Sequence, residues 1–298
     1  MMRSSRHRRL VDARAGRQPE GPVAASVPRR RERRPAHVNP VLLALLALSV
    51  VGLLWSTGVL TALFDIGGPR NILWIDGRVT VVPAGSADGQ RLLPAVPVTT
   101  TGAHAFEHTG SDGVPVGYDP CVPIRYVTRP VGAPPESDRL IADAVASIQA
   151  ATGLSFESLG TTDEPLVEDR SPIQPRYGSG WAPVLFAWSD AVASPELAGD
   201  VVGVGGSNVV PAPRGDRSFL AAGRVLLDAP DLTTILGRPG GYARARAVIT
   251  HETAHVVGLD HVDDPTELMA PRTGAVTELG PGDREGLALI GQIACADS

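Results

Sequence analysis

The chain has 298 residues, of which 43% are hydrophobic and 20% are charged. This ordinary globular composition excludes wholesale disorder, a collagen-like repeat and a multispanning membrane protein. The formal net charge of −5 is unevenly distributed, because residues 1–40 carry 11 Arg against three acidic residues and leave a net charge of −13 on residues 41–298. The two parts of the chain are therefore interpreted separately.

An uncharged apolar stretch of 24 residues runs from Val41 to Phe64. As a helix it would be about 36 Å long, which is enough to cross the hydrocarbon core of a bilayer. A cleaved secretory signal, which has a shorter apolar stretch and a small-residue cleavage site, fits this segment less well, although a secreted form stays open as the alternative. We therefore predict one N-terminal transmembrane helix over residues 41–64.

The Arg-rich residues 1–40 directly precede this predicted span, with RRRERR at 29–34. The positive-inside bias predicts a single-pass protein of the cell membrane, with its Arg-rich tail in the cytoplasm and residues 65–298 outside. A basic tail could also bind nucleic acid, but its position beside a membrane helix favours contact with anionic lipid. We therefore expect a membrane partner and no nucleic-acid partner.

Residues 65–117 are expected to form a stalk or partly ordered linker. Apolar and polar residues alternate over 71–82 around Asp76-Gly77, which indicates a little strand structure, whereas residues 99–117 are rich in Thr, Gly, Ser and Asp. The folded domain is expected to start near Tyr118 and to include residues 118–298.

Within that domain the apolar patterns predict strands and helices in an irregular alternation. The first helix should be capped by Ser137, bury one apolar face and stop at Gly153. The expected elements are a strand at 123–130, that helix, strands at 183–188, 200–206 and 223–229, and helices at 242–257 and 281–290. The strands should build one sheet, so the predicted fold class is α+β, in the form of an α/β sandwich.

The sequence contains two cysteines, Cys121 and Cys295. Both fall on the predicted outer side of the membrane, where disulfides form and persist, so we expect them to pair with each other. Two buried free thiols are the alternative.

Chemistry is indicated most strongly by HETAHVVGLDH at 251–261, which matches H-E-x-x-H-x-x-G-x-x-H at every fixed position. On a helix, His251 and His255 are one turn apart and can converge on one metal ion. Glu252 is one position further on, which keeps its carboxylate away from direct ligation and leaves it able to act as a general base.

A glycine and a third histidine complete the motif. Gly258 can adopt the left-handed conformation that ends the helix and turns the chain, which brings His261 toward the other two imidazoles. Three neutral imidazoles leave one tetrahedral position of a zinc ion open, as in catalytic zinc sites. We therefore expect one catalytic Zn²⁺ held by His251, His255 and His261.

With these residues the sequence resembles the metzincin clan of zinc endopeptidases, whose zinc motif is followed by a turn containing methionine. Met269, in ELMAP at 267–271, fits that position, and its short spacing from His261 is most similar to the matrixin branch. The resemblance implies a matrixin-like catalytic fold, Met269 as the apolar floor of the site, and a peptide or protein substrate.

The resemblance thus implies a membrane-anchored extracytoplasmic endopeptidase that hydrolyses peptide bonds through a metal-bound water, with Glu252 as the base. The alternative is a cell-surface binding domain that contains zinc without catalysing hydrolysis. Two family features do not carry over: Cys121 lacks the surroundings of a cysteine that blocks the zinc, and Pro271 stands where the astacin branch has tyrosine.

Four weaker signals remain. HAFEH at 104–108 matches an inverted zinc motif, but its Thr- and Gly-rich flanks predict no helix, so we reject it as a metal site. A calcium site is an open alternative, but the acidic residues that could form it match no defined calcium loop. Roles in turns and helix caps explain them better; these residues are Asp228, Asp231, Asp263 and Asp264. Trp181 and Trp188 are expected in the core or cleft wall. A substrate could pair with 201–206 or with the strand ending near Leu227.

Overall fold

The computed structural model describes residues 48–50, 72–75, 78–81, 89–178, 180–212, 217–272 and 275–296. The chain divides into two compact units, Met1–Phe64 and Asp65–Ser298. Only residues 48–50 of the first unit are described, and they are helical. The Arg-rich tail and most of the predicted span at 41–64 therefore lie outside the described residues. Among the residues that are described, no helix is both long enough and apolar enough to span a membrane.

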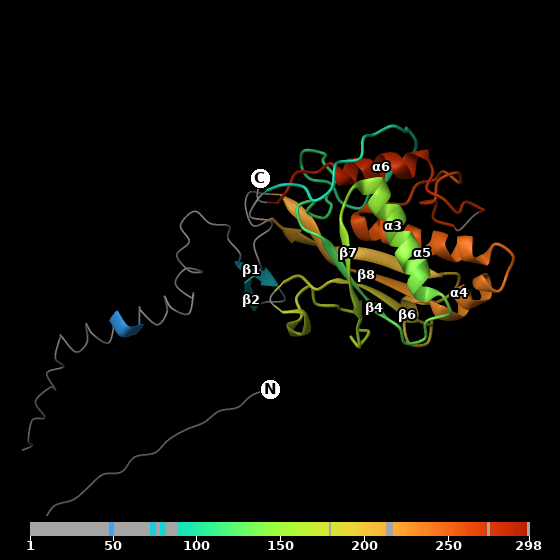
Figure 1. The fold of residues 1–298 in the computed structure, drawn as a ribbon, viewed down its shortest axis with the longest axis horizontal. Helices are drawn as coiled ribbons and strands as arrows, with labels where there is room; N and C mark the ends of the chain where they lie inside the picture. Colours follow the sequence, from blue (N-terminus) through green and yellow to red (C-terminus); the bar gives the residue numbers. More distant parts are fainter. Residues whose placement is uncertain are drawn as a thin grey trace, which may run out of the picture. The chain divides into compact units, whose positions relative to one another are not determined.

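The second unit is built on a mixed five-stranded sheet with the strand order β5-β4-β6-β8-β7 (Figure 1). Strands β5, β4, β6 and β8 are parallel, whereas β7 runs antiparallel to β8 at one edge. The strands are β4 (Ile124–Arg129), β5 (Phe156–Thr161), β6 (Val184–Ser189), β7 (Gly203–Pro211) and β8 (Ser218–Asp228). Each of the four strands predicted for this domain overlaps one of them, and they share one sheet as expected.

Strand β5 was not predicted, and its burial explains why. It lies at the other edge of the sheet, and all of its residues after Phe156 are exposed. Its backbone pairs with β4. A strand that buries almost no side chains has no apolar alternation to reveal it in the sequence.

Helices cover one face of the sheet (Figure 1). The fold is therefore a mixed α/β architecture, and this general part of the predicted fold class is confirmed. They are α3 (Ser137–Thr152), α4 (Ala229–Leu236), α5 (Gly241–Val257) and α6 (Pro281–Gly291). The predicted apolar face of α3 is buried, and Gly153 ends that helix with a φ of 69° as expected. The expected Ser137 cap is wrong, because Glu136 occupies the cap position without a side-chain hydrogen bond.

Helix α4 is a second unpredicted element. Its N-cap is Asp228, whose side chain accepts a hydrogen bond of 2.8 Å from the backbone amide of Asp231. This capping role accounts for one of the carboxylates considered for calcium. Asp264 is explained in the same way, because its side chain accepts from the amide and hydroxyl of Thr266 in a turn.

The core lies mainly between α3, α5 and the sheet, and Trp188 is fully buried in it. The opposite sheet face carries a smaller apolar cluster that the short 3₁₀ helix Pro195–Leu197 covers. Trp181 is partly buried against a third cluster. Both tryptophans therefore contribute to packing, as expected.

A buried ion pair holds the connection between β5 and β6, which includes the 3₁₀ helix Pro175–Tyr177. The Arg170 guanidinium donates to both carboxylate oxygens of Glu164, at 2.7 and 3.1 Å. Burial alone would raise the pKa of the Glu164 carboxyl, but hydrogen bonds from Arg170, Gln174 and Tyr177 hold that pKa below its ordinary value.

Residues 89–117 belong to the folded unit, so the expected domain start near Tyr118 is too late. We call this segment the N-terminal strap. Its short strand β3 (Ala105–Phe106) pairs antiparallel with β9 (Leu259–Asp260), and the amide of Gly102 donates to Glu285 on α6 at 2.8 Å. The sequence signal was misleading, because small polar residues that look like a loosely ordered linker here permit close backbone packing.

Two local predictions are confirmed. Cys121 and Cys295 form a disulfide with their Cα atoms 5.6 Å apart, which excludes two free thiols. Strands β1 (Ile72–Ile75) and β2 (Arg78–Val81) pair antiparallel, as the alternation around Asp76-Gly77 indicated.

Candidate metal centre

Helix α5 carries three of the four polar residues of the predicted site, His251, Glu252 and His255, and it ends where the sequence predicts. Gly258 follows the helix with a φ of 110°, and its amide donates to the carbonyls of Ala254 and His255. A side chain on Gly258 would also lie within 2.7 Å of the Val116 carbonyl oxygen in the strap. Glycine is therefore required both by the left-handed turn and by the close approach of the strap.

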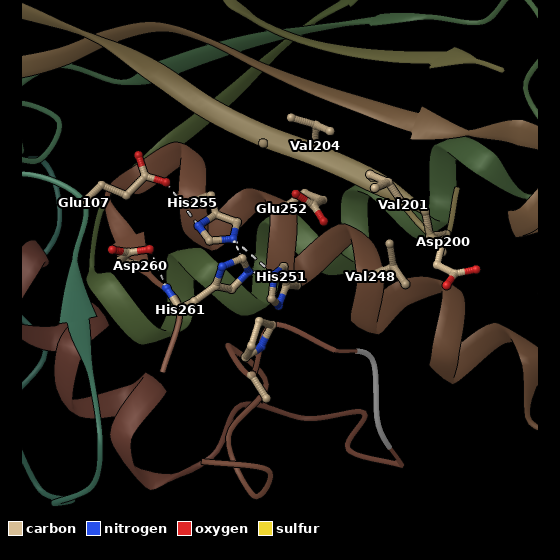
Figure 2. A pocket seen from close by; sticks show the side chains of 15 residues that line it. Glu107, Asp200, Val201, Val204, Val248, His251, Glu252, His255, Asp260 and His261 are labelled. Atoms are coloured by element: carbon tan, nitrogen blue, oxygen red, sulfur yellow. Dashed lines mark hydrogen bonds and ion pairs between the residues drawn. The ribbon is translucent and has the colours of Figure 1, made fainter. Parts of the chain in front are cut away.

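The structure brings the three predicted ligands together, as Figure 2 shows. The Nε2 atoms of His251, His255 and His261 lie 3.1 Å from one another in all three pairs. Nitrogen ligands of a tetrahedral zinc ion with bonds of 2.0 to 2.1 Å are roughly 3.3 to 3.4 Å apart. The observed triangle is thus within a few tenths of an ångström of zinc geometry.

Hydrogen bonds on the far side of two rings define their tautomers. The Nδ1 atoms of His251 and His255 lie 2.7 and 2.8 Å from the carbonyl oxygens of Leu268 and Leu259. Because a carbonyl oxygen only accepts, each Nδ1 carries the proton and each Nε2 presents a lone pair. Nitrogen lone pairs that converge in this way repel one another unless a cation lies between them, so the donor set fits a metal ion.

The ring environments also favour the neutral ligand form at two positions. Burial, together with the neighbouring His255, lowers the pKa of His251 to about 4. Burial and His255 likewise lower the pKa of His261. At His255 burial would lower the pKa, but the hydrogen bond to Glu107 and the charges of Glu252 and Glu107 raise it. His255 is therefore the ring of the three with the strongest anionic support.

Glu252 is buried between α5 and the edge strand β7 (Figure 2). Its carboxylate accepts a hydrogen bond from the backbone amide of Gly205. Burial raises the pKa of Glu252 to about 7, although His255 and the Gly205 amide act in the opposite direction. A carboxyl group with a pKa near neutrality can both take up and release a proton at physiological pH.

The histidine cluster (His251, His255 and His261) and Glu252 open onto a cleft of about 390 Å³. One wall is the segment from Asp200 to Gly205 at the start of β7, and Ala270 and Pro271 line the cleft as well. Of the two strands considered for substrate pairing, β8 is paired on both sides, whereas β7 is an edge strand. The structure therefore leaves β7 as the strand available beside the histidine cluster.

The turn that contains Met269 is fixed from two directions. Met269 is fully buried, and its amide and that of Leu268 donate to the buried carboxylate of Asp283 on α6. Glu267, in return, accepts hydrogen bonds from the amides of Gly282 and Asp283. Since the Leu268 carbonyl accepts from His251, this reciprocal pair of carboxylates also positions one histidine of the cluster.

Glu107 also belongs to this site, although the sequence did not predict it. Glu107 lines the same cleft, and its Oε1 lies 3.2 Å from Nδ1 of His255. It lies within HAFEH at 104–108, the sequence that matches an inverted zinc motif. As expected, these residues do not form a helix: Ala105–Phe106 form a strand, and the ring of His104 contacts Gly102 and Glu285.

No family model matches the chain, and no curated protein matches it either. The resemblance to metzincins therefore depends on the motif residues and on the geometry described above.

Proposed function

We propose that this chain is a zinc-dependent endopeptidase of the metzincin type, with a matrixin-like catalytic domain. The observation that carries the proposal is the triangle of three Nε2 atoms, 3.1 Å apart, beside the buried carboxylate of Glu252 in one cleft. A domain that needs a metal only for structure has no use for a buried carboxylate beside the ligands.

In this proposal His251, His255 and His261 hold the zinc ion. When bound, zinc supplies a Lewis acid that polarises the peptide carbonyl and makes water more acidic. The absence of cysteine from the donor set and the presence of a cleft beside it favour a catalytic site over a structural one.

Glu252 acts as the general base. It accepts a proton from the water that attacks the peptide carbonyl and returns that proton to the leaving amine, so the carboxylate is regenerated at each turnover. The Gly205 amide holds the carboxylate in place, and burial provides a pKa suited to both transfers.

The substrate in this proposal is an extended peptide that pairs with the edge strand β7. Residues Val201 to Gly205 line the cleft, and the last three of them, from Gly203 on, belong to β7, whose outer edge has no partner strand in the described sheet. Backbone pairing of this kind gives affinity with little dependence on sequence, while side-chain pockets give selectivity.

We further propose that residues 41–64 anchor the protein in the cell membrane, with the catalytic domain on the outer side. The support is the uncharged stretch of 24 residues preceded by the Arg-rich tail. N-terminal sequencing of the mature chain tests this: an intact N-terminus in the membrane fraction is expected, and a start near residue 65 would favour the secreted alternative.

The function is tested with the purified full-length chain, an unfolded protein substrate, and Zn²⁺ added or removed by a chelator. Parent protein should cleave the substrate, and Glu252→Gln should lower kcat by about 10²- to 10⁴-fold while still binding one zinc. Glu278→Gln is the matched control, because Glu278 is an exposed glutamate that pairs with Arg246. Folded, zinc-loaded parent protein without cleavage would favour the binding-domain alternative.

A further inference from the structure

We propose that Glu107, in the N-terminal strap, is a positioning residue of the metal centre, which orients the imidazole of His255 and strengthens metal binding. This inference depends on the metal site of the proposed function. It assigns a role to a residue that lies far from the zinc motif in the sequence.

The geometry distinguishes Glu107 from a metal ligand. Its carboxylate approaches Nδ1 of His255, at 3.2 Å, whereas the Nε2 atom of the same ring faces the other two histidines (Figure 2). Glu107 is therefore on the opposite side of the ring from the converging nitrogens. From there it can fix the ring and stabilise its tautomer without coordinating the metal.

Among the described contacts of the histidine cluster, the ring with a carboxylate oxygen beside its Nδ1 atom is that of His255. Its Nδ1 lies 3.2 Å from the Glu107 carboxylate and 2.8 Å from the Leu259 carbonyl oxygen, whereas Nδ1 of His251 lies against the Leu268 carbonyl. The nearby Asp260 carboxylate accepts from the backbone amide of His261. An anion on the outer nitrogen makes an imidazole a better electron donor, so Glu107 should contribute to affinity through His255.

The strap holds Glu107 in this position by its backbone. The amide of Glu107 donates to the Gly258 carbonyl at 3.0 Å, and the two preceding residues form β3, which pairs with Leu259–Asp260. The carboxylate is thus attached to the same turn that connects His255 to His261. Little reorganisation is needed for it to reach the ring, which is the requirement for an effective positioning group.

The test measures zinc affinity, not hydrolysis, on the full-length chain. Metal-free protein is titrated with Zn²⁺ in competition with a chromophoric chelator, and thermal unfolding is recorded with and without the metal. Glu107→Ala should weaken zinc binding by about 10- to 100-fold. Glu107→Gln, which keeps the size and an acceptor oxygen but lacks the charge, should fall between Glu107→Ala and the parent.

Glu285→Gln is the matched control, because Glu285 also binds the strap, through Gly102 and His104, but does not contact His255. It should leave zinc affinity within about threefold of the parent, well below the loss expected for an orienting carboxylate. Zinc affinities that are equal in the parent and both Glu107 variants would overturn the inference, and so would an equal loss in Glu285→Gln. A parent that binds no zinc would overturn the proposed function as well, so the two failures are distinguishable.

Discussion

Gly205 in the edge strand β7 lies so close to Glu252 on helix α5 that a side chain at this position would overlap the Glu252 backbone carbonyl. Gly203 has a similar relationship with the Glu252 side chain, whose Cγ would be 2.8 Å from an added Cβ. The glycines of this strand therefore allow the sheet edge to approach the helix that carries His251, Glu252 and His255. The backbone also shifts register between Gly206 and Asn208.

This close approach predicts that substitution of Gly205 destabilises the fold, whereas substitution of the neighbouring Gly206 does not. Gly205→Ala should push β7 away from α5, lower the free energy of unfolding by about 1 to 3 kcal/mol, and reduce proteolysis. Gly206→Ala should change stability by no more than about 0.5 kcal/mol, because an added Cβ there meets no atom within 4 Å. Urea unfolding of both variants measures the difference, and equal effects would contradict the proposed packing.

The fully buried Met269 gives a second prediction. Met269→Ala should lower the free energy of unfolding by about 2 to 5 kcal/mol, since it leaves a cavity in the core. It should also weaken zinc binding, because the adjacent Leu268 carbonyl holds His251. Met269→Leu conserves volume and should cost less than about 1.5 kcal/mol. Thermal unfolding and zinc titration test both variants; a Met269→Ala protein as stable as the parent would exclude a packing role.

The disulfide predicts a large effect of reduction. It closes a loop with a sequence separation of 174 residues, and the chain-entropy model gives roughly 5 kcal/mol of stabilisation as an upper value for such a loop. The double variant Cys121→Ser, Cys295→Ser should unfold at lower urea concentration than the oxidised parent. Addition of a reductant should destabilise the parent and leave the double variant unchanged.

The buried Glu164–Arg170 pair predicts a dependence of stability on pH. The folded-state pKa of Glu164 is held below its ordinary value of 4.5, so the carboxylate stabilises the fold fully above pH 4.5 and loses this effect as the pH falls through the lower value. Glu164→Ala leaves Arg170 buried without its partner and should cost about 3 to 5 kcal/mol at pH 7. The difference from the parent should shrink in acid.

An exposed ion pair provides the control for that experiment. Asp163 is fully exposed and pairs with Arg176 at 2.9 Å. Asp163→Asn should leave stability nearly unchanged at every pH, because solvent screens such a pair. Urea unfolding from pH 7 to pH 3 compares the variants, and a Glu164→Ala deficit that does not diminish in acid would contradict the assignment.

The sequence predicted the parts of the candidate site that are local in the chain. His251, His255, Gly258 and His261 lie within one helix and one turn, so their spacing alone determines which side chains meet. The apolar face of α3 was predictable for the same reason. The disulfide was predictable because the sequence offers only one pair of cysteines.

Long-range pairings were not predictable from spacing. Glu107 reaches His255 only because the strap pairs with β9, and nothing in HAFEH indicates that contact. The choice of β7 as the free edge depends on the strand order, which apolar runs do not encode. Helix α4 had a usable signal, since Asp228 followed by Pro230 is a good helix start, but the preceding apolar strand obscured it.

The link between Cys121 and Cys295 joins the two ends of a covalent ring that contains the whole histidine cluster, Glu252 and Met269. A single backbone cut by a protease anywhere within the ring opens it without separating the fragments. Glu107 lies outside the ring, so a cut between Glu107 and Cys121 would leave it held by noncovalent contacts alone. The molecule is thus better protected against fragmentation in its site-bearing portion than in the strap that supports it.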